Sequence, residues 1–177
     1  MTPPTTWLAA RPLNSARLRL EPLRVAHARE MFPVLDDVRL HTWIGGTPDP
    51  PAQLAARYRR QVAGQSPDGT RGWLNWVVRR TSDAQVIGTV QATLSRPDTG
   101  GPQASLAWTI GVAHQGSGFG REAALAMARW LRAQGVTHLV ASIHPEHGAS
   151  GAIARALGLA PTDVVVDGEV RWSDPGA

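Results

Sequence analysis

The order of three strand-like segments restricts the fold of this chain more than any other feature. In residues 73–79, 86–94 and 106–112, apolar residues occupy every second position, which is typical of strands that bury one face. In the second segment, this apolar face is predicted to begin at Val86. The connectors between the segments are short and turn-like. Because a parallel return needs a dozen or more residues, the three strands are predicted to pair antiparallel.

The third of these strands leads into a crossover. Residues 120–134 carry apolar side chains at helical spacing, Gly135 ends this helix, and a further strand follows at residues 137–143. Two strands joined through a helix return in the same direction. The strands at 106–112 and 137–143 are therefore predicted to run parallel.

The remaining segments complete the predicted order of elements. They are an irregular lead-in at 1–16, a strand at 17–21, helices at 28–35, 52–63 and 149–157, and a hairpin at 163–172 that turns at Asp167-Gly168. The prediction is an α/β (α+β) fold in a single domain, residues 1–177. Its mixed, mostly antiparallel sheet has about seven strands with one parallel pair, and about four helices flank it.

Two residue types are missing, and their absence excludes several kinds of chemistry. The chain has no cysteine and no lysine, which excludes disulfides, thiolate metal sites, cysteine nucleophiles and lysine Schiff bases; no metal is predicted. The formal charge of +4 comes from scattered arginines, so no nucleic-acid partner is indicated. Residues 1–10 lack a signal-peptide pattern and no long apolar run occurs, so we expect no membrane span and a cytoplasmic location.

The strongest chemical signal lies between Val112 and Glu122. This segment contains Gly116, Gly118 and Gly120 where a strand ends and a helix begins. The first turn of a helix presents unpaired N–H groups and the positive end of the helix dipole, and glycine lets a ligand approach the backbone. A tight turn alone would also explain the glycines. Three of them in one connection favour a phosphate or pyrophosphate site, to which Arg121 can add a charged contact.

Two common nucleotide-binding motifs do not fit this loop. A P-loop requires a lysine, which the chain lacks. A dinucleotide fingerprint requires the spacing GxGxxG after the first strand of a βαβ unit and an acidic residue about 20 positions later. Here the spacing is GxGxG, and the following strand ends in Ala141-Ser142-Ile143 without a carboxylate.

Residues 115–120 resemble a different motif, the Q/R-x-x-G-x-G/A loop of the GNAT acetyltransferases. Residues 145–150, with Leu157-Gly158-Leu159 after them, are similar to the P-x-N-x-x-S…L-G-F segment of the RimJ/RimL-like branch. The resemblance covers nearly the whole chain. It implies that the central parallel pair splays apart. It also implies direct acetyl transfer from acetyl-CoA to a primary amine, on a protein N-terminus or a small molecule.

The resemblance also implies which residues hold the coenzyme. Pantetheine would lie along the end of the strand before the loop, and the pyrophosphate would lie on the loop. The implied contacts are Ile110, Gly111, Val112, Gln115, Gly116, Ser117, Gly118, Phe119, Gly120, Arg121, His147 and Ser150. A backbone N–H near Val112 would polarise the thioester carbonyl.

Two positions depart from the family pattern. Ala154 stands where many GNAT enzymes have a tyrosine, and the single tyrosine, Tyr58, falls in the second predicted helix. Ser150 matches the serine that the RimJ/RimL-like branch uses instead, as a proton donor or coenzyme contact, although a helix-capping role is equally consistent. His147 replaces the family asparagine and can bind the coenzyme or act as a base. The candidate catalytic residues are Ser150, His147, Glu169 and His144.

The acceptor side is the least determined part of the sequence. His41 and Trp43 fall between the two early helices, where the resemblance implies the acceptor pocket, so they are candidate substrate contacts. The departures leave a second function open, namely a catalytically weak, CoA-binding regulatory module. A homodimer is expected from the resemblance alone.

Overall fold

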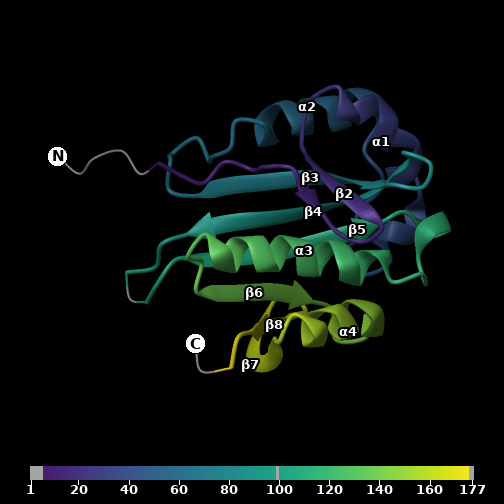
Figure 1. Cartoon of the computed structure of the whole chain (residues 1–177). Helices are drawn as coiled ribbons and strands as arrows, with labels where there is room; N and C mark the ends of the chain where they lie inside the picture. The colour runs from purple at the N-terminus through teal and green to yellow at the C-terminus, as the bar shows by residue number, and fades with distance from the viewer. Residues whose placement is uncertain (1–5, 99, 176–177) are drawn as a thin grey trace.

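The computed structural model describes residues 6–98 and 100–175, so the first five residues of the predicted lead-in lie outside the described residues. The order of strands and helices along the chain is much as the sequence predicts (Figure 1). In chain order, the elements are β1 (Leu13–Asn14), β2 (Leu18–Pro22), α1 (His27–Leu35), the 3₁₀ helix η1 (Val38–His41), α2 (Pro51–Gln61), β3 (Gly72–Arg80), β4 (Val86–Ser95), β5 (Gln103–Ile110), the 3₁₀ helix η2 (Val112–His114), α3 (Phe119–Ala133), β6 (His138–Ile143), α4 (Gly148–Ala156), β7 (Ala160–Val166) and β8 (Glu169–Ser173).

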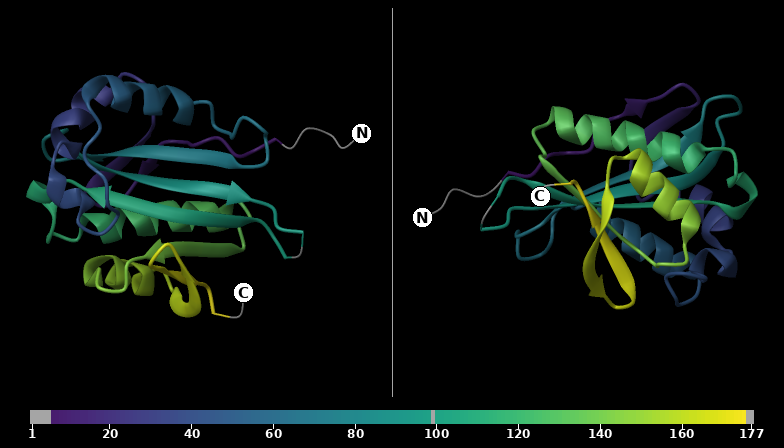
Figure 2. Two further views of the ribbon diagram at one scale, coloured as in Figure 1. Left: turned by 180° about the vertical axis from the view of Figure 1, so that it is seen from behind. Right: turned by 90° about the horizontal axis from the view of Figure 1, so that it is seen from below.

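The strands form one mixed sheet. It has eight strands in the order β1-β2-β3-β4-β5-β6-β8-β7. The neighbours β3, β4 and β5 pair antiparallel, and β5 pairs parallel with β6, as the connector lengths predict. The closing hairpin turns at Asp167 and Gly168, which both have positive φ, and it extends beyond the rest of the sheet (Figure 2). The expected α/β fold with one parallel pair is confirmed, with the short β1 as an additional strand.

Helices cover both faces of the sheet (Figure 2). α3 and α4 pack on one face, where the alternating residues of β3 and β4, such as Leu74, Trp76 and Val90, meet Met127 and Leu131 of α3 in the main core. α1 and α2 pack on the other face in a smaller cluster. Burial of these apolar stripes provides the main stabilisation of the three-layer arrangement.

A β-bulge changes the predicted face of one residue. The alternation along β4 predicts that Val86 shares a face with Val90. The register between β3 and β4 shifts at Val78/Arg79, so Val86 instead joins the cluster beneath α1 and α2, while Ile87 enters the main core. A bulge adds one residue to a strand and thereby inverts the alternation beyond it. The prediction for Val86 was therefore wrong.

The described part of the lead-in is mostly irregular and ends in β1. Its backbone is nevertheless held in place, because Trp76 Nε1 donates a hydrogen bond to the carbonyl of Arg11 at 2.7 Å. Trp7 packs against the main core, and its Nε1 donates to the carbonyl of Gly69 at 3.0 Å. The segment therefore closes the edge of the core despite its lack of regular structure.

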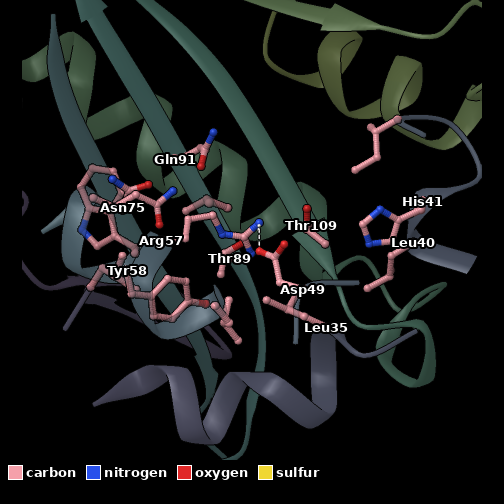
Figure 3. A pocket seen from close by; sticks show the side chains of 16 residues that line it. Leu35, Leu40, His41, Asp49, Arg57, Tyr58, Asn75, Thr89, Gln91 and Thr109 are labelled. Carbon is pink, nitrogen blue, oxygen red and sulfur yellow. Dashed lines mark ion pairs between the residues drawn. The ribbon is translucent and has the colours of Figure 1, made fainter. Parts of the chain in front are cut away.

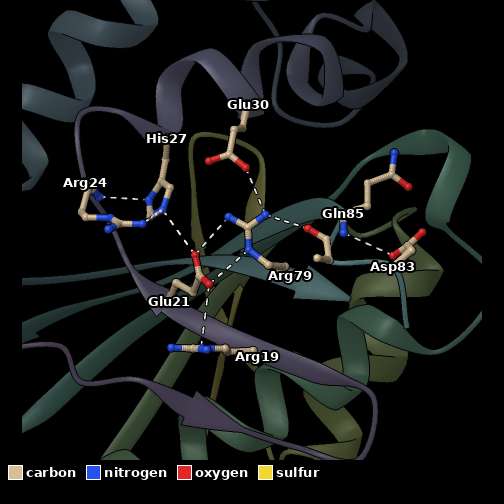
Figure 4. Close-up of polar contacts among 9 residues, drawn as sticks. Arg19, Glu21, Arg24, His27, Glu30, Arg79, Asp83 and Gln85 are labelled. Atoms are coloured by element: carbon tan, nitrogen blue, oxygen red, sulfur yellow. Dashed lines mark hydrogen bonds and ion pairs between the residues drawn. The ribbon is translucent and has the colours of Figure 1, made fainter. Parts of the chain in front are cut away.

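Charged side chains fill the space between β2, β3 and α1 (Figure 4). Glu21 accepts two hydrogen bonds from Arg79, at 3.1 Å each, and Arg79 also contacts Glu30. His27 is fully buried and lies 3.4 Å from Glu21. Its Nδ1 accepts a hydrogen bond from the backbone N–H of Arg24 at 3.1 Å, and its Nε2 lies 3.1 Å from Nη2 of the same arginine.

This cluster predicts that stability is lost in mild acid. Burial, together with the nearby Arg24 guanidinium, lowers the pKa of His27 below its ordinary value of about 6.5. As the pH falls below 6.5, the imidazole of His27 is protonated in the unfolded chain but stays neutral in the folded protein. Each unit by which the folded-state pKa is lowered therefore reduces the free energy of unfolding by up to about 1.4 kcal/mol. Hydrogen bonding to Arg79 lowers the pKa of Glu21, so its own contribution is lost only below about pH 4.5. Melting curves between pH 7 and 5 should show a falling midpoint. This fall should be smaller in His27→Gln than in the native protein. In the control variant His138→Gln, which alters a histidine on β6, it should be as large as in the native protein.

Candidate functional site

The parallel strands β5 and β6 separate part of the way along their length. Their ladder consists of the pairs Gln103↔His138, Ala104↔Leu139 and Ser105↔Val140. Beyond Val140, β6 pairs only with β8. The edge of β5 from residue 106 to residue 110 thus faces a gap instead of a neighbouring strand, which is the splay that the resemblance implies. A cavity of about 380 Å³, the gap cavity, lies between Ser105–Thr109 and Ala141–His144.

The glycine-rich loop lies at the end of this free edge. Gly116 and Gly118 have φ of +78° and +80°. Residues other than glycine, asparagine and aspartate rarely adopt such values. The first helical hydrogen bond of α3 runs from the N–H of Glu122 to the carbonyl of Gly118. Among the described residues, the N–H groups of residues 116–121 have no acceptor, and no side chain caps the helix. Such a row of free donors at a helix N-terminus is an anion site.

The turn between β1 and β2 holds this loop from outside. Arg17 Nε donates to Glu122 at 2.7 Å, and its Nη1 donates to the carbonyl of Ser117 at 3.0 Å. The same guanidinium lies 4.4 Å from the centre of the Phe119 ring. Ser15 adds a 2.7 Å hydrogen bond to Glu122. These contacts fix the loop so that the carbonyl of Ser117 accepts a hydrogen bond from Arg17. The N–H groups of residues 116–121 take no part in them.

A second cavity, of about 350 Å³, lies against the loop and is called the loop cavity here. Its wall includes Gln115, Gly116, Gly118, Phe119, Gly120 and Arg121. Gly120 lies between two apolar side chains: an added Cβ would approach Ile153 to 3.1 Å and Ile110 to 3.3 Å. Gln115 Nε2 donates to the carbonyl of Ile110 at 2.9 Å, which ties the loop to the end of β5.

Ser150, Trp108 and His147 meet where the two cavities adjoin, and all three line both of them. Trp108 Nε1 donates to Ser150 Oγ at 3.2 Å, and Oγ lies 3.5 Å from His147 Nε2. An indole N–H can only donate, so it occupies a lone pair of the hydroxyl oxygen. The hydroxyl proton of Ser150 is therefore free to point to His147 or into the cavity.

Trp43 covers the two histidines at this junction. Its ring stacks on His147 with centroids 5.4 Å apart, and the ring of His144 lies 5.1 Å away. Burial, and then the neighbouring His144, lower the pKa of His147. His147 is consequently neutral at pH 7, and its imidazole can accept a proton.

The other predicted site residues fall into two groups. Glu169 and His144 line the gap cavity together with Ser150. His41 lies apart from them, in a cavity beneath α2, where its Nδ1 is 3.0 Å from the carbonyl of Gly45. The N–H of Gly111 donates to the carbonyl of Ile87 at 2.8 Å, so it has no free donor for a ligand. Gly111 instead allows α1 to approach, because an added Cβ would lie 2.6 Å from Val34.

Trp108 and Arg17 are site residues that the sequence did not predict. Trp108 follows the alternation of Leu106 and Ile110, which indicates a core residue, yet it is only partly buried because β6 has already diverged. Its position next to the glycine loop was the available signal. Arg17 is far from the loop in sequence, and no local pattern connects the two.

Two further findings concern metal-binding groups and membrane-spanning helices among the described residues. Within residues 6–98 and 100–175, no group of three or more His, Cys, Asp or Glu side chains is arranged to hold a metal ion. Across the same residues, none of the helices has the length and apolar character needed to cross a membrane.

Comparison with known proteins identifies the fold. The chain resembles the acetyltransferase from Agrobacterium tumefaciens C58 (22% identity, TM-score 0.69, covering 96% of each chain). It also resembles the Salmonella typhimurium acetyl transferase that modifies the N-terminal serine of ribosomal protein L7/L12 (11%, 0.73, covering 92% of this chain and 98% of that one). A third similar structure is the microcin C7 self-immunity acetyltransferase MccE in complex with acetyl-CoA and AMP (13%, 0.70, 90% and 93%). At these identities the likeness shows the fold. A search of curated proteins gave no match.

The family itself is shown by sequence. The model of the acetyltransferase (GNAT) domain matches residues 17–160, which include the glycine loop, the splayed strands and Ser150. Ribosomal-protein acetyltransferases are among the structural neighbours that share this fold. The chain therefore belongs to the GNAT family of acetyltransferases.

Proposed function

We propose that this protein transfers the acetyl group of acetyl-CoA directly to a primary amine while both substrates are bound. The observation that carries the proposal is the free edge of β5 beyond Ser105 ending at a loop whose amides lack acceptors. The amides of residues 116–121 bind the pyrophosphate, and Arg121 adds positive charge. The edge of residues 106–110 binds the amide groups of the pantetheine arm, as an additional strand would, and directs the thioester into the gap.

The junction of the two cavities supplies the proton transfers. The amine nitrogen attacks the carbonyl carbon, the carbon–sulfur bond breaks, and the amine loses a proton while the thiolate gains one. In this proposal the neutral His147 accepts the proton that the amine loses. Ser150, oriented by Trp108, gives its own proton to the thiolate and takes up the proton from His147, so both side chains end as they began. Trp43 excludes water from this junction, where His144 and Glu169 line the amine side.

Two measurements test the proposal as a whole. Calorimetry should detect CoA binding, and release of the CoA thiol should follow when acetyl-CoA is mixed with a panel of primary amines. Binding without thiol release from any amine would favour the alternative function, a CoA-binding regulatory module. Absence of CoA binding would exclude both functions.

The role of His147 predicts a specific pH dependence. Every primary amine must lose its own proton, which makes the logarithm of kcat/KM rise with a slope of about one below the pKa of the amine. Because the pKa of His147 is lowered, its protonation adds a second slope only below about pH 6.5. Rate profiles from pH 5 to 9 should therefore steepen to a slope of about two in the native protein. The profile of His147→Gln, whose amide still reaches Ser150, should keep a slope of about one. Profiles of the same shape would remove His147 from the proton transfer.

A further inference from the structure

A third cavity, of about 290 Å³, lies between α2 and the sheet and is called the sheet cavity here (Figure 3). It adjoins the gap cavity, since Ile44, Thr89, Gln91 and Thr109 line both. It lies on the α1 and α2 side of the sheet, whereas the loop cavity is bounded by α3 and α4. An amine whose nitrogen lies in the gap can thus extend its remaining atoms into the sheet cavity.

The sheet presents polar side chains to this cavity, where a covered sheet face would ordinarily be apolar. Asn75 and Gln91 are directly opposite each other on β3 and β4, and Thr89 and Thr109 are opposite on β4 and β5. All four line the cavity (Figure 3). Next to them, under α1 and α2, the same face carries the apolar Val77. The change from apolar to polar along one face marks a place where hydrogen-bonding groups are needed.

The charge of the sheet cavity is balanced. Asp49 is the carboxylate that lines it, and Arg57 lies 2.8 Å from this carboxylate in an ion pair (Figure 3). A cationic arm would have to compete with Arg57 for Asp49, and an anionic arm would have to compete with Asp49 for Arg57. Both competitions cost free energy in a partly enclosed site. An uncharged polar arm meets neither cost.

Tyr58 bounds the sheet cavity but does not present its hydroxyl to it. The residue is 2% exposed and belongs to the apolar cluster under α1 and α2. Within residues 6–98 and 100–175 its hydroxyl finds no hydrogen-bond partner, and the oxygen has almost no accessible surface. Burial raises its pKa to about 12, so the hydroxyl keeps its proton. The hydrogen-bonding groups that can contact an occupant of the cavity are therefore those of the sheet, above all the amides of Asn75 and Gln91.

From this arrangement we infer that the acceptor is an amine with an uncharged, oxygen-bearing arm, such as a hydroxyl or a carboxamide. The arm occupies the sheet cavity and forms hydrogen bonds with the side-chain amides of Asn75 and Gln91. The inference rests on the proposed acetyl transfer and narrows its substrate class. Polyamines, which carry a second cation, are disfavoured, because that cation would have to displace Arg57 from Asp49. A peptide N-terminus and a small amino alcohol or amino amide share this chemistry.

The test compares variants on the same amines, so that differences in amine basicity cancel. Four probes are used: the peptide Ser-Ala-Ala, L-alaninamide, n-butylamine and spermidine. For the native protein, kcat/KM should be highest for the first two, and the peptide exceeds L-alaninamide if the natural acceptor is a polypeptide. Asn75→Ala should lower kcat/KM for those two by about three- to tenfold, the usual worth of one neutral hydrogen bond, and leave n-butylamine unchanged.

A second pair of variants covers the sheet face. Gln91→Ala should reduce the preference for oxygen-bearing amines to a similar degree, whereas Gln85→Ala, a change near the start of β4 and outside the cavities, should not. An equal preference in the native protein, Asn75→Ala and Gln91→Ala would overturn the inference while leaving acetyl transfer intact. Failure of every amine to react would instead count against the proposed function.

Discussion

Replacement of Gly118 by aspartate is expected to weaken CoA binding about 100-fold without unfolding the protein. Gly118 has φ of +80° and precedes the first residue of α3. Aspartate tolerates this conformation, and an added Cβ would lie at an ordinary contact distance of 3.5 Å from Arg17 Nη2. The new carboxylate would lie beside the amides proposed to hold the pyrophosphate. Two like charges about 5 Å apart in a partly exposed site repel by about 3 kcal/mol, which corresponds to two orders of magnitude in affinity.

Gly118→Asn separates this charge effect from shape. Asparagine has nearly the same size, adopts positive φ at least as readily, and can hydrogen-bond the same amides, but it is neutral. We expect Gly118→Asn to lose less than about tenfold in CoA affinity by calorimetry. The melting points of both variants should remain close to that of the native protein, because either side chain can cap α3. Equal affinities for aspartate and asparagine variants would show that the pyrophosphate does not lie at these amides.

Most of the fold was predictable because the patterns that determine it, apolar alternation and helical periodicity, each lie within a short stretch of sequence. The alternation in residues 73–112 determined three strands and their antiparallel pairing, and the crossover through α3 determined the parallel pair. The bulge at Val78/Arg79 was not predictable, since it depends on how two strands fit against each other. The hydrogen bond from Trp76 to Arg11 likewise joins residues that are distant in sequence.

The site was predictable where backbone groups form it and much less so where side chains meet. The free amides of the loop follow from the glycines and the start of a helix, both visible in sequence. The junction of Ser150, Trp108 and His147 depends on the point at which β5 and β6 diverge, which no single segment reveals. Tyr58 illustrates the same limit. Its position on an amphipathic helix predicts a core residue. Only the positions of the surrounding side chains show that its hydroxyl has no hydrogen-bond partner among the described residues.

Ser150→Ala is the second change with a large expected effect. Removal of the hydroxyl should lower kcat about 100-fold, the lower range of what a positioned general acid contributes. The reason is geometric: Trp108 Nε1 occupies a lone pair of Oγ at 3.2 Å, and the proton of the hydroxyl is left to donate at the junction of the two cavities. The amides proposed to bind the pyrophosphate are untouched, so the dissociation constant for CoA should change less than about threefold. A fall in kcat at constant coenzyme affinity is the expected sign of an interaction made in the transition state.

Ser142→Ala is the matched control for this experiment. Ser142 also lines the gap cavity, but it lies on β6, paired with Arg171 of β8. Its loss should leave kcat nearly unchanged. Trp108→Phe tests the orientation of the hydroxyl separately, because phenylalanine fills much of the same space without an N–H. We expect about a tenfold lower kcat in that variant, and little further loss when it is combined with Ser150→Ala, because Trp108 acts through the hydroxyl that Ser150→Ala removes. A native rate in Ser150→Ala, or full additivity of the two changes, would show that the thiolate receives its proton from another group.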